Sequence, residues 1–396
     1  MGPLSGTLIA WTAGVACASA QAILAPRPAR APIGAPSRRD VLLARAVTGD
    51  DAALGRALAS LPTYLGGALA IRVGVESTTD GAYDVARAAC SALAAAGHDA
   101  RVVVTGARGP NAKADQLARI VAAEAKAPDV VVVADGCVDL AGLSLDELLA
   151  PLADPAVGAV WAAPIEIAPT TLADRASAAV LDASLHAFSL LARLDPRGMV
   201  GKLCAIRGET LASVGGFGAL VDVLGEDMEL ARRLDALGLA TVVSTVQARS
   251  LAGGRSFGEV VARYARWIAV IRAQRPHLLP SYPLLLAATP LLAGFALVAT
   301  AIEGAPALVV LAAAVAARVA VTIAARRASG RSIDLRALVV DAPLADLVLL
   351  LAFARAVGTR ELVWRGRGLR VGADGALTAR SAGGSAPAIV ATRGPS

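Results

Sequence analysis

The chain has 396 residues, of which 56% are hydrophobic and only 3% aromatic, and its mean hydropathy is +0.60. This apolar balance excludes an ordinary soluble protein and predicts several membrane segments around a globular part. The net charge is +6. Attraction to anionic lipid headgroups explains that charge better than nucleic-acid binding, because no basic stretch is interleaved with aromatic residues. The separated cysteines and histidines offer neither a disulfide frame nor a metal-binding spacing.

The first apolar stretch, residues 4–25, has no charged side chain and is long enough to span a bilayer. A cleaved signal peptide is the alternative. It would have basic residues before the apolar core, whereas the arginines here follow it. The positive-inside rule then places the N-terminus outside and the next domain in the cytoplasm. Residues 26–36 are rich in proline and predict a linker.

From Asp40 onward, short apolar stretches alternate with segments of helical spacing. Strands are predicted at residues 41–47, 68–75, 100–105, 130–133, 159–163 and 241–247. Helices are predicted at residues 50–61, 83–96, 114–127, 172–194 and 257–275. This alternation predicts an α/β domain with a mostly parallel, Rossmann-like sheet and helices on both faces. Ligands bind such sheets at the carboxyl ends of the strands.

The C-terminal part predicts further membrane segments. Residues 284–302 and 305–325 are apolar, and arginines after the second return the chain to the cytoplasmic side. A third tract, residues 337–356, contains two aspartates and a proline. We expect it to be re-entrant or interfacial, because a span there would place the arginine-rich tail outside. Residues 361–375 predict a small β-hairpin with an Asp-Gly turn.

Asp135 and Gly136 follow the most continuous β-branched stretch directly. A carboxylate at this place suits a divalent cation, Mg²⁺ or Mn²⁺, that bridges a sugar-nucleotide diphosphate, because hard cations prefer oxygen ligands. The alternative is an ordinary Asp-Gly turn. Asp139 is too far along the chain to be an obvious second ligand.

Glu226 and Asp227 open a helix, and Arg263, Arg266 and Trp267 follow shortly before the apolar tracts. Burial or a neighbouring carboxylate can raise the pKa of Asp227 and make it a general base, with Glu226 orienting or capping. The arginines suit a diphosphate and the tryptophan suits a sugar face. As alternatives, the acidic pair complements the helix dipole, and the Arg–Trp group anchors the helix at the bilayer surface.

The coupling of Glu226-Asp227 to an Arg-x-x-Arg-Trp segment resembles the membrane-bound ceramide glucosyltransferase family. The resemblance covers most of the chain. It implies a glycosyltransferase-A fold and inverting transfer of a hexose from a UDP-sugar to a lipid hydroxyl. In this family an aspartate in the place of Asp227 is the base, one in the place of Asp135 holds the metal, and the Arg-x-x-Arg-Trp segment completes the donor site. The tail at residues 364–367 is similar to bacterial relatives, including hopanoid-biosynthesis glycosyltransferases.

The same resemblance extends to Asn111-Ala-Lys113, which is similar to the family's Asn-Pro-Lys and implies that Lys113 pairs with a donor phosphate. As the alternative, Asn111 caps a helix and Lys113 is solvated. The family's first aspartate is replaced here by Ser77. Glu76 or Asp80 is then the residue expected to contact the uracil base.

Together these features predict an integral, multi-pass glycosyltransferase of a bacterial-type inner membrane, with a cytoplasmic catalytic domain and no nucleic-acid partner. The expected acceptor is a ceramide-type lipid, and a hopanoid or another lipid alcohol is the alternative. A processive polysaccharide synthase would need more membrane segments, and a degenerate, non-catalytic lipid or sugar-nucleotide scaffold is the rival of another class. The predicted parts are an anchor (1–26), a linker (27–39), a catalytic domain (40–255), an interfacial helix (256–280), a transmembrane or re-entrant region (281–358) and a basic tail (359–396).

Overall fold

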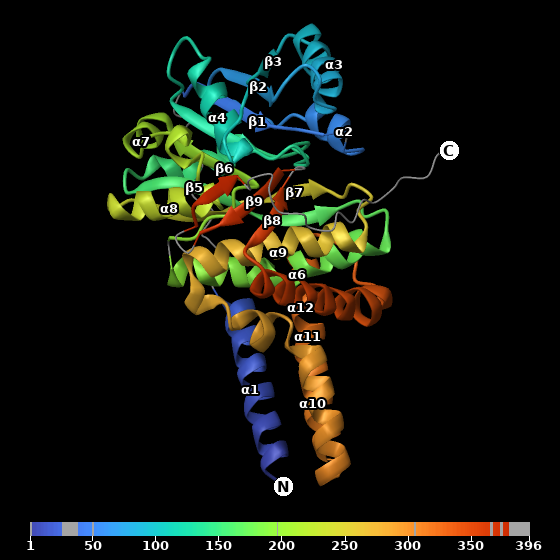
Figure 1. Cartoon of the computed structure of the whole chain (residues 1–396). Coiled ribbons are helices and arrows are strands. Elements are labelled where there is room, and N and C mark those ends of the chain that lie inside the picture. The colour runs from blue at the N-terminus through green and yellow to red at the C-terminus, as the bar shows by residue number, and fades with distance from the viewer. Residues whose placement is uncertain are drawn as a thin grey trace.

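The central element of the fold is a mixed, mostly parallel sheet, seen in the upper part of Figure 1. This computed structural model describes residues 2–25, 39–49, 51–195, 197–304, 306–364, 367–372 and 375–379. In the described chain the sheet has seven strands in the order β3-β2-β1-β4-β6-β5-β7. The strands are β1 (Val41–Ala46), β2 (Leu69–Val75), β3 (Asp99–Val104), β4 (Val130–Ala134), β5 (Val157–Ile167), β6 (Leu203–Arg207) and β7 (Ala240–Leu251).

The strands form where the sequence is continuously apolar and β-branched. All five residues of β4 are buried, and β4 pairs in parallel with β1. Two-sided burial of this kind is typical of a central parallel strand. The predicted α/β sheet is therefore confirmed. The strand that the sequence analysis missed is β6, which runs antiparallel to both β4 and β5.

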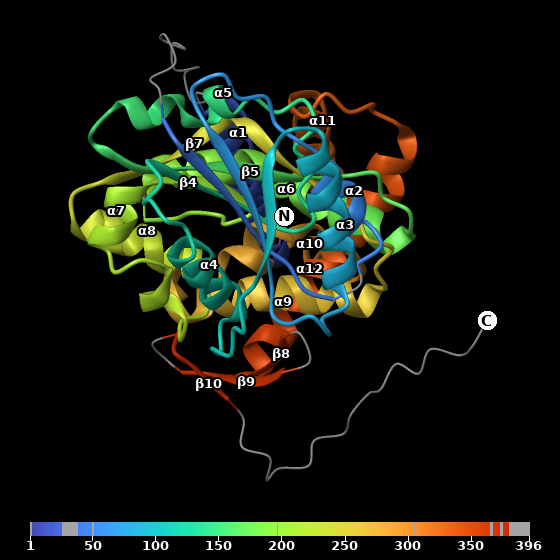
Figure 2. The ribbon, with the colours of Figure 1, turned by 90° about the horizontal axis from the view of Figure 1, so that it is seen from above.

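Helices cover both faces of the sheet, as the view from above shows (Figure 2). They are α2 (Leu54–Ala59), α3 (Ala82–Ala95), α4 (Ala112–Ala122), α5 (Leu145–Leu149), α6 (Leu172–Leu194), α7 (Gly208–Ser213), α8 (Glu226–Ala236) and α9 (Phe257–Gln274). The two long helices begin at capping boxes, Thr171 with Asp174 in α6 and Ser256 with Glu259 in α9. Such reciprocal side-chain bonds satisfy amide groups that a helix start leaves unpaired.

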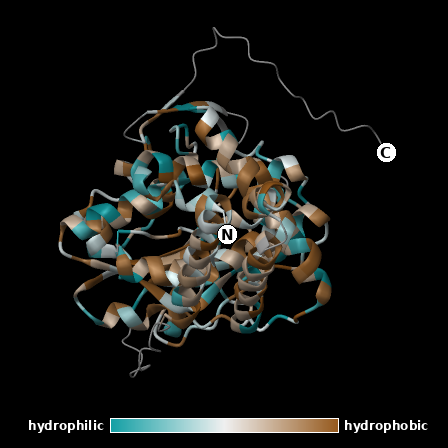
Figure 3. Cartoon of the chain, turned by 90° about the horizontal axis from the view of Figure 1, so that it is seen from below, coloured by the Kyte–Doolittle hydropathy of each residue, from teal (hydrophilic) through white to brown (hydrophobic). Residues whose placement is uncertain are grey.

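Below the sheet domain, α6 and α9 lie in a layer with α12 (Ala342–Gly358) (Figure 1). From this layer α1 (Pro3–Leu24), α10 (Ala288–Glu303) and α11 (Pro306–Ala328) project away from the sheet. Seen from below, pale and brown residues predominate on the helices around the start of α1 (Figure 3). By length and composition three helices in the described chain can cross a membrane: α1, Ala307–Ala328 and Ala337–Gly358. A fourth candidate is bent by 59° between Pro276–Leu286 and Ala288–Glu303.

The third C-terminal apolar tract lies along α6 and α9, across the direction of α1 and α10 (Figure 1). Its two aspartates form ion pairs within the protein. Asp341 is 3.0 Å from Arg175 of α6, and Asp346 is 2.9 Å from Arg318 of α11. These pairs explain how acidic residues are accommodated in an apolar segment, because a buried charge needs a partner.

The tail folds as three antiparallel strands, β8 (Glu361–Trp364), β9 (Arg367–Val371) and β10 (Leu377–Ala379), where a two-stranded hairpin was predicted. This small sheet packs on α9 and on the segment before α8 through Leu224, Ala269, Leu369, Val371 and Leu377. The predicted linker at residues 26–36 and two residues of the predicted Asp-Gly turn, 373 and 374, lie outside the described residues.

Candidate active site

The site is built at the carboxyl end of β4. Asp135 follows this strand directly, and its amide nitrogen donates a hydrogen bond to the carbonyl oxygen of Lys202, at 2.9 Å. Because β6 is antiparallel to β4, the residue that precedes β6 lies beside the residue that follows β4. The topology thus brings Lys202 next to Asp135. The sequence analysis did not include Lys202. No local pattern around Lys202 indicates a site, and only the pairing of β4 with β6 brings it to Asp135.

Both carboxylate oxygens of Asp135 form ion pairs. Lys113 Nζ is 2.8 Å from Oδ1, and Lys202 Nζ is 2.9 Å from Oδ2. The Asp135 side chain is 24% exposed, so part of it reaches the surface. Burial raises the pKa of Asp135, but the two ammonium groups outweigh it and hold the pKa well below its ordinary value. Asp135 is therefore ionised.

The backbone of the loop after β4 is hydrogen-bonded to Arg45, a buried arginine that interrupts the apolar pattern of β1. Its guanidinium donates to the carbonyl oxygens of Asp135 at 3.1 Å, Val138 at 2.7 Å and Ala57 at 2.7 Å. Burial lowers the pKa of Arg45 to about 10, which leaves it charged near neutral pH. Arg45 fixes the backbone that carries Asp135.

Lys113 connects Asp135 to the acidic pair. Its ammonium lies 3.1 Å from Glu226 Oε1 and donates to the carbonyl oxygen of Gly201 at 2.9 Å. Although burial alone lowers it, the charges of Asp135 and Glu226 raise the pKa of Lys113 well above its usual value. The alternative of a solvated Lys113 is wrong, because the side chain is only 13% exposed.

Asn111 holds the other oxygen of Glu226. Its Nδ2 atom donates to Glu226 Oε2 at 3.0 Å, and its Oδ1 atom caps α4 by accepting from the amide of Ala114. The predicted helix cap at Asn111 is confirmed. Burial raises the pKa of Glu226, but the charge of Lys113 and the Asn111 hydrogen bond reverse this and lower it. Glu226 is therefore a fixed negative charge.

Asp227 is the adjacent carboxylate, and two backbone amides orient it. Gly201 N donates to Oδ2 at 2.7 Å, and Met228 N donates to Oδ1 at 2.9 Å. Burial, followed by the charge of Glu226, raises the pKa of Asp227 to about 6. A carboxylate with a pKa close to neutrality is ionised at neutral pH and still basic enough to accept a proton from a hydroxyl group.

The residues predicted to contact uracil follow β2. Asp80 accepts hydrogen bonds from Thr48 Oγ1 at 2.5 Å, Gly49 N at 2.8 Å and Ala82 N at 2.9 Å. It therefore ties the loop after β1 to the start of α3. Glu76 is partly buried, and its carbonyl oxygen accepts from Gly106 N after β3. Their contacts with a donor base stay predictions.

The Arg-x-x-Arg-Trp residues lie on α9. Arg263, predicted to face a diphosphate, is buried and has Nη1 2.6 Å from Glu166 Oε1 of β5. Its guanidinium carbon is 5.6 Å from the centre of the Trp267 ring. Arg266 is partly buried on the same helix. The sequence analysis missed Glu166, although a lone acidic residue in an apolar strand is a signal for a buried ion pair.

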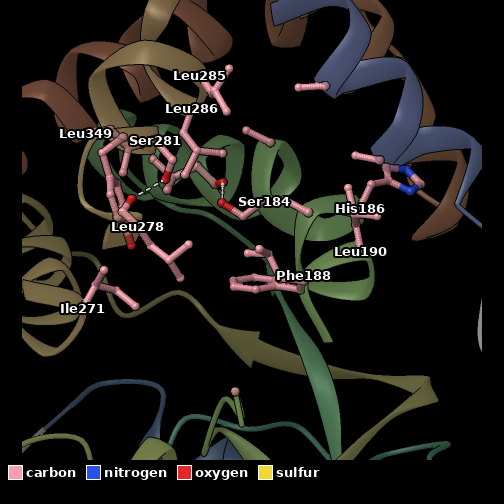
Figure 4. Close-up of a pocket in the computed structure, with 18 of the residues that line it drawn as sticks. Ser184, His186, Phe188, Leu190, Ile271, Leu278, Ser281, Leu285, Leu286 and Leu349 are labelled. Atoms are coloured by element: carbon pink, nitrogen blue, oxygen red, sulfur yellow. Dashed lines mark hydrogen bonds between the residues drawn. The ribbon is translucent and has the colours of Figure 1, made fainter. Parts of the chain in front are cut away.

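An apolar groove of about 410 Å³ lies between α1, α6, α9 and the bend before α10 (Figure 4). Phe188, Leu190, Ile271 and Leu286 are among its lining residues, and Trp267 also lines it. The labelled serines in Figure 4 donate to carbonyl oxygens of their own helical segments. The lining also includes Val200 and Met228, the chain neighbours of Gly201 and Asp227. The lining of the groove therefore comes within one residue of the candidate base in the sequence.

The donor set at Asp135 does not fit a preformed divalent-cation site. Cations of this kind require several oxygen ligands, and both Asp135 oxygens are engaged by ammonium groups. Within the described ranges no three His, Cys, Asp or Glu side chains converge to hold a metal ion. Lysine is the side chain that this site presents instead.

The sequence profile described as "Glycosyl transferase family 21" matches residues 4–377. The chain belongs to this family. Family membership, together with the observed sheet and apolar helices, confirms the predicted glycosyltransferase-A architecture and a glycosyltransferase associated with membranes. The predicted resemblance to the ceramide glucosyltransferase family is confirmed as membership of the family. The likeness to hopanoid-biosynthesis enzymes stays a prediction. No curated protein matches the sequence significantly.

Solved structures also resemble this family 21 chain. The mannosyltransferase PcManGT from Pyrobaculum calidifontis, in complex with GDP-Man and Mn²⁺, is 17% identical, with 89% of this chain and 96% of that one covered and a TM-score of 0.48. Glucosyl-3-phosphoglycerate synthase from Mycobacterium tuberculosis, in complex with Mg²⁺ and UDP, is 18% identical, with 68% and 84% covered and a TM-score of 0.35. The family assignment rests on the sequence match and not on these structures.

Proposed function

We propose that the protein transfers a hexose, with inversion, from a UDP-sugar to the hydroxyl group of a membrane lipid. The observation that carries this proposal is that Met228, the residue after Asp227, lines the apolar groove, as does Val200, whose neighbour Gly201 donates a hydrogen bond to Asp227. A lipid whose tail occupies the groove presents its polar end to the carboxylate. The groove volume of about 410 Å³ lies within the range of known ligand pockets.

In the proposed reaction Asp227 accepts the proton of the lipid hydroxyl as its oxygen attacks the anomeric carbon. The bond from that carbon to the diphosphate breaks, and its electron pair leaves with the nucleoside diphosphate. Attack from the face opposite the leaving group inverts the anomeric centre. The two backbone amides fix the orientation of the Asp227 carboxylate, and burial together with the charge of Glu226 keeps its pKa raised.

A ceramide-type lipid is the first acceptor to test, and a hopanoid or another lipid alcohol is the second. Each combines an apolar body with a terminal hydroxyl group, which is the combination that the groove and Asp227 can accept. The projection of α1, α10 and α11 from one side supports a multi-pass membrane placement (Figure 1). The arginines that follow residues 4–25 and 305–325 support our proposal of an inner membrane with the sheet domain in the cytoplasm.

The full chain, purified in detergent and returned to lipid nanodiscs, is the preparation for the test. Radiolabelled UDP-glucose, UDP-galactose and UDP-N-acetylglucosamine are offered with ceramide, hopanoid polyol or total lipid extract, and the lipid product is analysed by mass spectrometry. We expect a hexosylated lipid from the wild type and a rate about 10²- to 10⁴-fold lower from Asp227→Asn. Asp222→Asn is the matched control, because Asp222 is exposed and lies shortly before Asp227.

Two results would contradict the proposal. Equal rates from the wild type and Asp227→Asn would remove Asp227 as the base. Binding of UDP by the wild type without turnover on any lipid would favour the non-catalytic scaffold.

A further inference from the structure

Lys202 precedes β6 and lies outside the residues that the family resemblance implicates. Its Nζ atom is 2.9 Å from Asp135 Oδ2 and 3.3 Å from the sulfur of Cys137. The side chain is only 13% exposed, although lysine is normally found in solvent. Burying a second ammonium group against a carboxylate that already has a partner is costly. A role beyond the ion pair would explain why this lysine is present.

The two lysines differ in how their donors are used. An ammonium group has three N–H donors. Those of Lys113 have three oxygen acceptors: Asp135, Glu226 and the carbonyl of Gly201. For Lys202 the described residues supply one oxygen, at Asp135, and one sulfur, which is a weak acceptor. Lys113 is thus saturated by the protein, whereas Lys202 has capacity for a ligand oxygen.

We propose that Lys202 binds the diphosphate of the sugar nucleotide beside the partly exposed side chain of Asp135, where it neutralises the leaving group in place of a divalent cation. This inference rests on the proposed function. As the anomeric carbon–oxygen bond breaks, its electron pair moves onto the phosphate oxygen, and the Lys202 ammonium stabilises the added negative charge by a charge-assisted hydrogen bond. Lys202 does not have to transfer a proton to the leaving group, and no second carboxylate is needed to hold a cation beside Asp135.

Lys113 then acts as a positioning residue. It keeps Asp135 ionised and holds Glu226, while Asp135 in turn orients the ammonium of Lys202 towards the ligand. This division of roles predicts different consequences for the two lysines. Loss of Lys202 removes a ligand contact, whereas loss of Lys113 leaves two carboxylates, Asp135 and Glu226, without a shared partner.

Binding of UDP to the full-length protein, measured by titration calorimetry with EDTA or with Mn²⁺, tests the proposal independently of turnover. We expect the wild type to bind UDP in EDTA and Lys202→Met to bind roughly ten- to hundredfold more weakly, as for a lost hydrogen bond to a charged group. Lys202→Arg, which keeps the charge, should retain part of the affinity. Lys126→Met is the control, because Lys126 is 77% exposed and pairs with Asp40 away from the site. Thermal unfolding confirms that each variant is folded.

The outcomes separate this inference from the proposed function. If the wild type binds UDP only with Mn²⁺ and Lys202→Met binds equally well, the role of Lys202 is overturned and the proposed function stands. If the wild type binds neither UDP nor GDP in either condition, both are overturned. Tighter binding of GDP than UDP, with the same loss in Lys202→Met, supports Lys202 and overturns only the uridine donor.

Discussion

Gly201 N donates a hydrogen bond to Asp227 Oδ2 across 2.7 Å, so the segment before β6 contacts the candidate base directly. The next residue, Lys202, pairs with Asp135. A Cβ atom at position 201 would lie 2.9 Å from the Cβ atom of Asp227, so this approach requires glycine. The two consecutive residues Gly201 and Lys202 therefore set the distance between Asp227, the candidate base, and the Lys202 ammonium group, which we propose binds the leaving group.

The pH dependence of the reaction follows from the raised pKa of Asp227, about 6. The carboxylate accepts a proton only when it is ionised, so activity is present above that pKa and is lost as the pH falls through it. We expect kcat/KM, measured between about pH 5 and 8, to show an acidic limb close to the pKa of the free enzyme's base. A flat profile across this range would contradict the assignment of the base.

Glu226→Gln provides a sharper form of the same test. The negative charge of Glu226 contributes to the raised pKa of Asp227, so its removal should move the acidic limb to lower pH. Glu229→Gln is the control on the same helix, because the Glu229 carboxylate pairs with Arg232 and Arg233. A limb that moves upward in Glu226→Gln, or that moves equally in Glu229→Gln, would show that another group titrates.

Gly225 determines where the acidic pair is placed. Its φ angle is +76°, and an added Cβ atom would lie 2.4 Å from Val270 of α9. Gly225→Ala should therefore combine about 1–2 kcal/mol of backbone strain with a steric clash. Gly238→Ala isolates the strain, because Gly238 has φ +73° and no neighbour within 4 Å.

Thermal unfolding and kcat of these variants provide the measurement. We expect Gly225→Ala to lower the unfolding midpoint further than Gly238→Ala, and adding Val270→Ala to recover the difference. Only the Gly225 variant should lose kcat, because Gly225 directly precedes Glu226 and Asp227. Gln274 also holds this segment, since its side-chain amide donates to the carbonyl oxygens of Leu224 and Gly225. Equal losses of stability in Gly225→Ala and Gly238→Ala would show that the predicted clash with Val270 does not contribute.

Local patterns predicted much of the fold. The four valines of β4 indicated a buried parallel strand, and Asp135 after it marked the edge where a ligand site lies. The acidic residues at Glu226 and Asp227 marked the start of a helix, and α8 begins there. These features depend on short-range periodicity and on helix-start chemistry, which a single sequence records directly.

The parts that were missed depend on contacts between distant segments. Lys202 reaches Asp135 only because β6 inserts antiparallel beside β4, and no local period shows that pairing. Arg45 interrupts the apolar pattern of β1, and only the folded chain shows that its buried guanidinium holds the loop that carries Asp135. Arg263 was assigned to the donor, while its observed partner, Glu166, is 97 residues away in sequence.

The ion pair between Arg263 and Glu166 predicts a mainly structural effect of Arg263→Met. Leaving a buried carboxylate short of a partner should cost roughly 3 kcal/mol. Burial raises the pKa of Glu166, and Arg263 with Arg255 outweighs it, so the native pKa is lowered. That stabilisation is present above the unfolded-state pKa and is lost as the pH falls. The deficit of Arg263→Met should therefore be largest at neutral pH and should shrink in acid.

Unfolding midpoints at several pH values, paired with UDP binding at a temperature where the variant is folded, separate the two roles of Arg263. We expect a lowered midpoint, UDP affinity close to that of the wild type, and partial recovery in the double variant with Glu166→Gln. Unchanged stability with lost UDP affinity would instead support the donor contact that the Arg-x-x-Arg-Trp pattern suggested.

The apolar groove predicts a variant that impairs the acceptor and spares the donor. Ala187 of α6 lines the groove, so Ala187→Phe fills part of it. Leu194→Phe places the same ring on the same helix at a position that is 72% exposed and does not line the groove. Overfilling a packed site typically costs about 1–3 kcal/mol, so the KM for the lipid should rise about tenfold in Ala187→Phe alone.

The lipid tail length makes this result specific to the groove. A shorter tail occupies less of the cavity, so the difference between Ala187→Phe and the wild type should diminish as the acceptor is shortened. UDP affinity should be the same in both proteins, because the donor contact that we propose is made by Lys202 beside Asp135, and neither residue lines the groove. An equal KM in Ala187→Phe and Leu194→Phe for every tail length would show that the acceptor binds elsewhere, and Asp227 would then need another route to its hydroxyl group.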